Sequence, residues 1–197
     1  MRNKFIISLL IPVLILAAMT VQPLLTLFLG QEVKIKTQPV DPVDLFRGDY
    51  VILSYEINDL KISQFPELDK IKESLGDYDQ SKKYLNKKVY VTLKEANGVY
   101  TVETAGFDKP QDKLYLAGKI NYFFNKRPAA PINDSESVKE GEKFVPDTAK
   151  VEYQLDKYFL PENTGHKLEE LSRQGQLIAT IKIYKGYALL ISVKEAK

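Results

Sequence analysis

The first thirty residues of the chain are almost entirely hydrophobic, whereas the remainder alternates between hydrophobic and polar positions. No residue from Phe5 to Leu29 is charged, and Arg2 and Lys4 precede this stretch. About twenty apolar residues in a helix cross the hydrocarbon core of a bilayer, so the stretch is long enough to span a membrane with some tilt. The pattern predicts a membrane-anchoring helix over about residues 5–29, with the lipid bilayer as its partner.

A cleaved signal peptide is the alternative for residues 1–30. In that case the apolar run ends near Ala17 and Ala18, at the cleavage site. Leu16, however, occupies a position at which a small residue is preferred, and the apolar run resumes over residues 24–29. We therefore expect the segment to remain in the protein as an uncleaved anchor.

The basic residues predict the orientation of the anchor. Positive charges beside a membrane helix stay in the cytoplasm, and Arg2 and Lys4 are the only charges on the short side of this helix. The N-terminus is then cytoplasmic, and residues 31–197 form an extracytoplasmic domain. The chain contains no cysteine, which suits that location without requiring it.

Beyond the anchor, an alternation with a period of two residues predicts a domain built mainly from β-strands. Residues 32–36 alternate valine or isoleucine with charged residues, and prolines at 39 and 42 end this strand. In residues 50–57 both faces carry hydrophobic side chains, so this strand is expected at the centre of a sheet. Four residues share one of its faces: Val51, Leu53, Tyr55 and Ile57.

Two hairpins are the clearest elements of this domain. Asn97-Gly98 separates two alternating runs, and Asn-Gly in that position is the strongest short-range hairpin signal. Lys185-Gly186 separates the last two runs in the same way. The expected strands are 89–95 with 99–104, 176–184 with 187–194, and single extended segments at 114–124 and 151–159.

Helical spacing is confined to two short segments. Apolar residues recur at helical spacing in 66–75, and a capping threonine and a terminal glycine frame 164–174. Residues 125–148 hold three prolines and no convincing period, which predicts a flexible surface loop. Residues 31–197 are therefore expected to form one mainly β domain with one or two short helices, and an α+β arrangement is the alternative.

Composition removes several classes of function. The 28 basic residues, less Arg2 and Lys4, equal the 26 acidic ones, so the domain lacks the positive charge that a nucleic-acid partner requires. The absence of cysteine excludes disulfides and thiol catalysis. With a single histidine, a zinc site would depend mostly on carboxylates, so we expect neither a metal site nor a cofactor.

A turn at residues 47–49 leads directly into the strand at residue 50, and the joined sequence is Gly-Asp-Tyr-x-x-Leu-x-Tyr. This pattern resembles the one that names the GDYXXLXY family of bacterial, membrane-anchored proteins. Because the biochemical function of that family is uncharacterised, the resemblance implies kinship and location but no activity. The motif residues are candidates for a structural or binding role: Arg47, Gly48, Asp49, Tyr50, Leu53 and Tyr55.

Two roles are open for this motif. Glycine adopts positive φ, and an aspartate beside it bonds nearby backbone N–H groups, so Gly48 and Asp49 are expected to form a turn that sets the register of the strand. Alternatively, Asp49 is a binding or catalytic carboxylate. The Arg-Gly-Asp tripeptide also matches an integrin ligand, but that motif requires an exposed loop tip and this one adjoins an expected core strand.

A second stretch, residues 155–165, also resembles the family. Family members have a lysine, two aromatic residues, an aliphatic residue, Pro-Glu and a glycine here, followed by a short acidic helix. Asn163 stands where many relatives have glycine. Glu162 could bind a ligand, although a carboxylate near the first turn of a helix is also simply stabilising. The possible binding residues are Lys157, Tyr158, Phe159, Pro161, Glu162 and Gly165.

Two functions remain open from the sequence. Members of the family are often encoded beside multi-pass membrane proteins, which implies a non-enzymatic accessory or binding subunit with such a partner. The alternative is a membrane-anchored hydrolase, because a Gly-Asp turn entering an apolar strand is similar to elements of signal-peptidase-type serine–lysine peptidases. That chemistry needs a serine and a neighbouring lysine. The chain lacks the Ser-Met pair of those enzymes, and it offers Ser54 with Lys113 or Lys119 instead.

Overall fold

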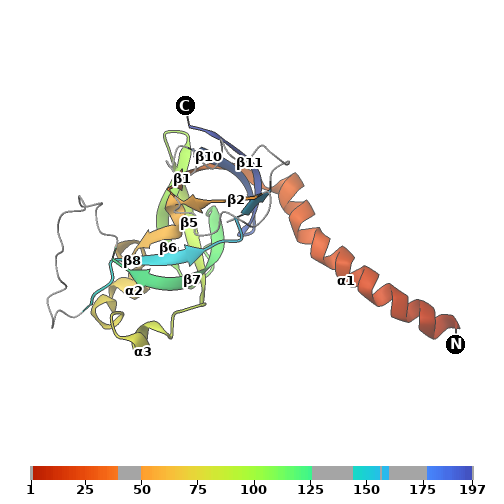
Figure 1. Ribbon diagram of the computed structural model, residues 1–197, viewed down its shortest axis with the longest axis horizontal. Helices are drawn as coiled ribbons and strands as arrows, with labels where there is room; N and C mark the ends of the chain where they lie inside the picture. The colour runs from red at the N-terminus through yellow and green to blue at the C-terminus, as the bar shows by residue number, and fades with distance from the viewer. Residues whose placement is uncertain (1, 40–49, 126–143, 156, 160–176, 197) are drawn as a thin grey trace.

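A single long helix, α1 (Arg2–Leu29), extends away from a β-rich domain in the computed structural model (Figure 1). The structure describes residues 2–39, 50–125, 144–155, 157–159 and 177–196. The segment Leu9–Leu29 has a mean hydropathy of 2.1 and is long and apolar enough to cross a membrane. Its large side chains are mostly exposed, as expected for a helix with no protein around it.

The helix enters the domain without a linker. Only Gly30 separates α1 from β1 (Gln31–Gln38), and the Gly30 N–H donates to the Thr26 carbonyl at 3.0 Å. A Cβ at Gly30 would lie 3.1 Å from the Lys182 Cβ, so glycine permits the close approach of the helix end to the last hairpin. The Lys182 ammonium donates to the Leu27 carbonyl at 2.6 Å, which satisfies one of the free carbonyls at the helix C-terminus.

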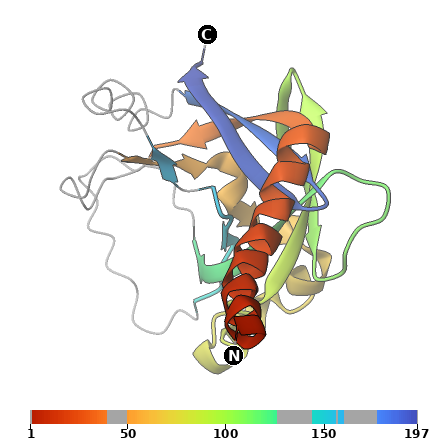
Figure 2. The same cartoon turned by 90° about the vertical axis from the view of Figure 1, so that its right-hand side faces the viewer.

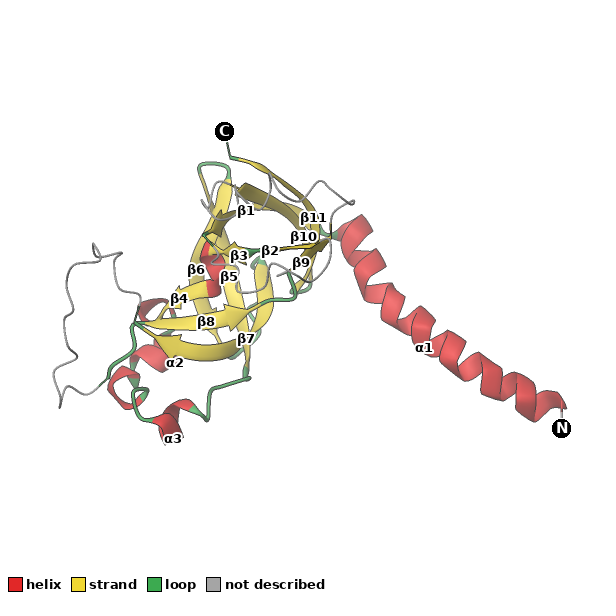
Figure 3. Ribbon diagram, in the orientation of Figure 1, coloured by secondary structure: helices red, strands yellow, loops and turns green. Residues whose placement is uncertain are grey.

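The described residues of the domain form three antiparallel sheets, and strands dominate them (Figure 3). The four-stranded sheet has the order β11-β10-β1-β3, the five-stranded sheet has the order β4-β8-β7-β5-β6, and β2 pairs with β9 alone. The remaining strands are β2 (Tyr50–Ile52), β3 (Ser54–Tyr55), β4 (Asp59–Lys61), β5 (Lys88–Ala96), β6 (Val99–Gly106), β7 (Tyr115–Phe124), β8 (Thr148–Glu152), β9 (Lys157–Phe159), β10 (Leu177–Tyr184) and β11 (Tyr187–Glu195).

The two larger sheets share one hydrophobic core. Alternate residues of β1, β5, β7, β8 and β10 point into it, as the two-residue period of a strand requires. The sheets are also joined by hydrogen bonds: Gln31 Nε2 donates to the Tyr100 hydroxyl at 3.2 Å, and the Ala117 N–H donates to the Gly186 carbonyl at 2.9 Å. The fully buried members of the core include Ile35, Tyr55, Leu60, Phe65, Leu68, Val89, Val91, Leu116, Ile120, Val151 and Ile181.

Both predicted hairpins are confirmed. Asn97 and Gly98 have φ of 54° and 77°, and Lys185 and Gly186 have φ of 50° and 84°, which is the pattern of type I′ turns. In Figure 2 the hairpin formed by β10 and β11 lies beside the domain end of α1. The strands predicted at 32–36 and 114–124 are also present, as β1 and β7.

The strand predicted over residues 50–57 is wrong in its length and its position. The chain exchanges partners at Leu53, since β2 pairs with β9 whereas β3 pairs with β1 at the edge of the four-stranded sheet. Residues Glu56–Asn58 then form a 3₁₀ turn, which the Asn58 carboxamide closes by accepting from the Tyr55 N–H at 2.7 Å. The hydrophobic side chains of this segment are buried in the core, although the segment does not lie at the centre of a sheet.

The helix predicted at 66–75 is replaced by shorter turns. They are α2 (Pro66–Asp69) and the 3₁₀ turn Lys72–Ser74, with a further 3₁₀ turn at Ile62–Gln64 and α3 (Tyr78–Ser81). Leu68 and Leu75 are nevertheless buried as their spacing predicts. The continuous extension over 151–159 is interrupted at residues 153–155, and the predicted loop is shorter at its C-terminal end because β8 begins at Thr148. Most of that loop and the helix predicted at 164–174 lie outside the described residues.

Candidate functional site

Two residues of the Gly-Asp-Tyr-x-x-Leu-x-Tyr motif lie in the core. Leu53 and Tyr55 are 3% and 1% exposed, and the backbone of Tyr50 begins β2. Residues 47–49 lie outside the described residues, so the roles of Arg47, Gly48 and Asp49 stay predictions. The two buried motif residues are therefore part of the hydrophobic core.

The two stretches that carry the family resemblance pair with each other. In the β2–β9 ribbon, Tyr50 stands opposite Phe159 and Ile52 stands opposite Lys157. The stretches are separated by about a hundred residues in the chain, and each is too short to form a sheet without its partner. The residues from 160 to 165, and the histidine at 166, lie outside the described part of the chain.

A set of buried hydrogen bonds ties the segment that follows the motif to residues 151–155. The Tyr55 hydroxyl donates to the Leu155 carbonyl at 2.7 Å, and the Tyr153 hydroxyl donates to the Ile57 carbonyl at 3.0 Å. Burial raises the pKa of the Tyr153 phenol, so this side chain stays neutral and serves as a hydrogen-bond donor. The arrangement satisfies buried carbonyls and is structural.

A serine and a lysine do lie together, but the lysine is not one of those expected from the sequence. Lys150 Nζ lies 3.3 Å from Ser54 Oγ and 2.7 Å from Asp59 Oδ1. Lys113 instead pairs with Glu103 at 2.9 Å, at the surface. The hypothesis that Lys113 partners Ser54 is therefore wrong.

The geometry around Ser54 opposes its activation as a nucleophile. A general base must accept the serine proton, whereas here Gln38 Nε2 donates to Ser54 Oγ at 2.7 Å and the Lys150 ammonium donates to the same oxygen. Asp59, whose side chain is 8% exposed, holds Lys150 as an ion pair. Asp59 also borders a pocket of about 300 Å³ with Lys61 and Lys72.

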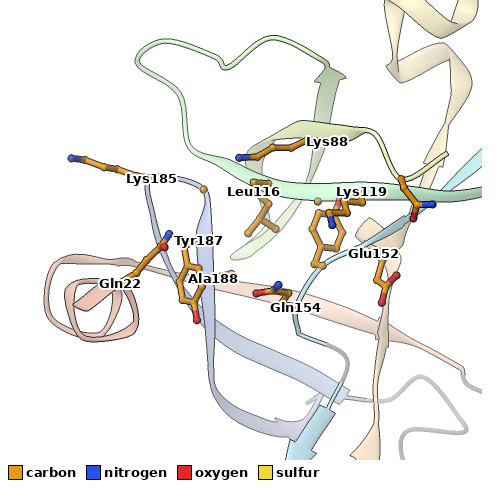
Figure 4. Close-up of a pocket in the computed structure, with 14 residues that line it drawn as sticks. Gln22, Lys88, Leu116, Lys119, Glu152, Gln154, Lys185, Tyr187 and Ala188 are labelled. Carbon is orange, nitrogen blue, oxygen red and sulfur yellow. The ribbon is translucent and has the colours of Figure 1, made fainter. Parts of the chain in front are cut away.

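The larger pocket lies where α1 meets the domain. It has a volume of about 590 Å³ and is lined by α1, β7, the end of β8 and the turn between β10 and β11. Figure 4 shows Lys88 and Lys185 at the upper rim, Gln22 and Tyr187 on one side, and Glu152 on the other. The lining residues are Gln22, Asn86, Lys88, Leu116, Ala117, Gly118, Lys119, Glu152, Tyr153, Gln154, Lys185, Gly186, Tyr187 and Ala188.

The walls of this pocket are joined by backbone contacts. Leu116 and Gly186 form an isolated parallel bridge, and the hydrogen bond from the Ala117 N–H to the Gly186 carbonyl completes it. The same contact places Lys185 at the pocket rim and Lys119 two residues beyond it on β7. Among the described residues, no three histidine or carboxylate side chains lie together in the manner of a metal site.

Comparison with known proteins bears on kinship. A family model described as GDYXXLXY protein matches residues 12–193, which is most of the chain. The chain belongs to the GDYXXLXY family. Neither the curated proteins nor the solved structures include a match.

In this member of the GDYXXLXY family, neither the contacts among Ser54, Lys150 and Asp59 nor the pocket beside α1 could be predicted from the sequence. Asp59 and Lys150 are about ninety residues apart in the chain, and neither belongs to a strand predicted from the sequence. Lys119 was considered only as a partner for Ser54, and it lines the pocket beside α1 instead. Of the segments that line this pocket, the type I′ turn at Lys185-Gly186 is the part that local sequence predicts.

Proposed function

We propose that this protein is a non-enzymatic, single-pass membrane protein of the bacterial envelope and an accessory subunit of a membrane partner. In this proposal α1 is an uncleaved anchor, the N-terminus is cytoplasmic and the β domain lies outside. The basic residues at positions 2 and 4 support the orientation. The hydropathy of Leu9–Leu29 supports the anchorage.

The observation that carries the proposal is the direct connection between helix and domain. With only Gly30 between α1 and β1, and with Lys182 bonded to the Leu27 carbonyl, the domain is held at one height and one orientation against the helix. A freely acting ectodomain needs no such connection and is commonly joined to its anchor by a flexible linker. A fixed domain suits a subunit that presents one surface to a neighbouring membrane protein.

The exposed surface of α1 provides the second part of the interaction. Pro12 and Pro23 lie inside the helix, and the Thr20 hydroxyl donates to the Leu16 carbonyl at 2.8 Å. Threonine is among the small residues that are enriched where helices pack against one another in a membrane. A transmembrane helix of a multi-pass protein is the partner that fits.

Cross-linking tests this proposal. We expect a membrane-impermeant, amine-reactive cross-linker, applied to intact spheroplasts, to capture the full chain together with a stoichiometric multi-pass protein. The exposed lysines of the β domain are accessible to such a reagent only if the domain is extracytoplasmic. Replacement of residues 5–21 by an unrelated apolar sequence of the same length is expected to abolish the capture.

This replacement keeps Gln22 to Gly30, so the contact between helix and hairpin is unchanged and only the lipid-facing part of α1 differs. Mass spectrometry of the gel-separated product identifies the partner. Capture that appears only after lysis would contradict the orientation. Capture that survives the replacement would contradict the helix-mediated contact.

The second candidate, a membrane-anchored hydrolase, is motivated by the 3.3 Å approach of Lys150 to Ser54. We expect the purified full chain to turn over peptide or ester substrates no faster than buffer alone, and Ser54→Ala to behave as wild type does. Lys150→Met is the matched partner variant. Turnover by wild type that both substitutions abolish, while the melting temperature stays unchanged, would establish the hydrolase instead.

A further inference from the structure

We propose that the pocket beside α1 binds the phosphate group of an anionic phospholipid in the outer surface of the membrane. The proposal rests on the membrane anchorage proposed above and adds a ligand to it. It follows from three properties of the pocket: its height along the helix, its charge and the construction of its walls.

The height of the pocket matches the lipid headgroups. A helix rises 1.5 Å per residue, so about twenty residues span a hydrocarbon core of about 30 Å. The apolar stretch of residues 5–29 is a few residues longer than the hydrocarbon core requires. With the basic pair at the inner surface, the core runs from Phe5 to about Leu24, and residues 25–29 continue into the headgroup region. Gln22 lines the pocket and lies within one helical turn of that boundary, so the pocket opens where headgroups lie.

The charge of the pocket favours an anion. Three lysines line it, Lys88 from β5, Lys119 from β7 and Lys185 from the β10–β11 turn, against the single carboxylate of Glu152. All three lysines are exposed. Ammonium groups near an anionic leaflet attract it by about 1 kcal/mol each, or roughly a factor of five in affinity. Three lysines from three separate elements attract an anion more strongly than a single surface lysine does.

The walls supply the remaining chemistry. Gln22, Gln154 and Tyr187 carry side-chain donors that can reach phosphate or glycerol oxygens, and Leu116 and Ala188 offer an apolar surface for the first methylenes. The backbone bond between Ala117 and Gly186 fixes the turn that bears Lys185, so the backbone of the rim is preformed, while the Lys185 ammonium lies 5.2 Å from the centre of the Tyr184 ring. A volume of about 590 Å³ is large enough for a whole headgroup.

Native mass spectrometry of the full chain in detergent tests the proposal. The wild type is mixed with equal amounts of phosphatidylglycerol and phosphatidylcholine that carry the same acyl chains. We expect phosphatidylglycerol to be retained, and the triple variant K88Q/K119Q/K185Q to reduce its retention by at least about tenfold. The control K70Q/K94Q/K194Q removes three exposed lysines from elsewhere on the domain and is expected to retain the lipid as wild type does.

The other outcomes separate the sources of failure. Equal retention of phosphatidylglycerol by both triple variants, or equal retention of the two lipids by wild type, would overturn the pocket as an anionic site. Displacement of the lipid by an equal concentration of inorganic phosphate would overturn a lipid source in favour of a soluble anion. Membranes washed with alkaline carbonate report on the anchorage separately: release of the wild-type chain would contradict the anchorage, and the lipid site with it.

Discussion

Replacing Tyr55 by alanine is expected to lower the free energy of unfolding of the β domain by about 3–5 kcal/mol, the usual cost of removing a large aromatic side chain from a core. Tyr55 is 1% exposed, and its hydroxyl donates to the Leu155 carbonyl at 2.7 Å. The substitution therefore opens a cavity and removes the donor from a buried carbonyl. Urea unfolding of the full chain in detergent, followed by far-ultraviolet circular dichroism, measures the change.

Two control variants separate the contributions to this effect. Tyr55→Phe keeps the ring and loses the hydroxyl, so we expect it to cost only about 1–2 kcal/mol. Tyr78→Ala removes a tyrosine that is 69% exposed and is expected to change stability by less than about 0.5 kcal/mol. A Tyr55→Ala variant that is as stable as wild type but loses the cross-linked product proposed above would show that the motif is a recognition site rather than a core element.

Gly186→Ala is expected to destabilise the domain by about 2–5 kcal/mol. Gly186 has a φ of 84°, and an L-residue in that region costs about 1–2 kcal/mol. A Cβ at this position would also lie 2.4 Å from Cε2 of the buried Tyr115, and such overpacking adds about 1–3 kcal/mol. Displacement of the turn would break the hydrogen bond between the Ala117 N–H and the Gly186 carbonyl, which joins the two larger sheets.

Gly98→Ala is the matched control, because Gly98 occupies the equivalent position of the other hairpin. Its φ is 77°, and a Cβ there would meet nothing within 4 Å. We expect this variant to lose only the backbone contribution, about 1–2 kcal/mol. The difference between the two variants, measured by the same unfolding assay, isolates the contact of the turn with Tyr115. Equal losses would mean that the contact adds no stability.

The elements that could be predicted from the sequence are those whose signal is contained in a few neighbouring residues. Asn97-Gly98 and Lys185-Gly186 specify type I′ turns because their backbone angles require a residue that tolerates positive φ. The burial of Leu53 and Tyr55 also follows from alternation alone. The length predicted for the strand at residues 50–57 was wrong, because a change of partner strand at Leu53 does not alter the alternation of hydrophobic and polar residues.

The candidate sites could not be predicted, because their members come from distant parts of the chain. Ser54 and Lys150 are 96 positions apart and meet only because β4 pairs with β8. Lysine is also exposed in most proteins, so the spacing of lysines along the chain does not distinguish a pocket rim from an ordinary surface.

By itself, the sequence determined the long apolar helix at the N-terminus, the mainly β character of the domain, its two type I′ hairpins and its membership of the GDYXXLXY family. Each of these depends on local composition, local periodicity or a short motif. Tertiary structure alone decided that the two family stretches pair as β2 and β9, and that α1 ends directly on the last hairpin. Those contacts depend on which strand faces are buried together, and that choice is made by the free energy of the whole core rather than by any one segment.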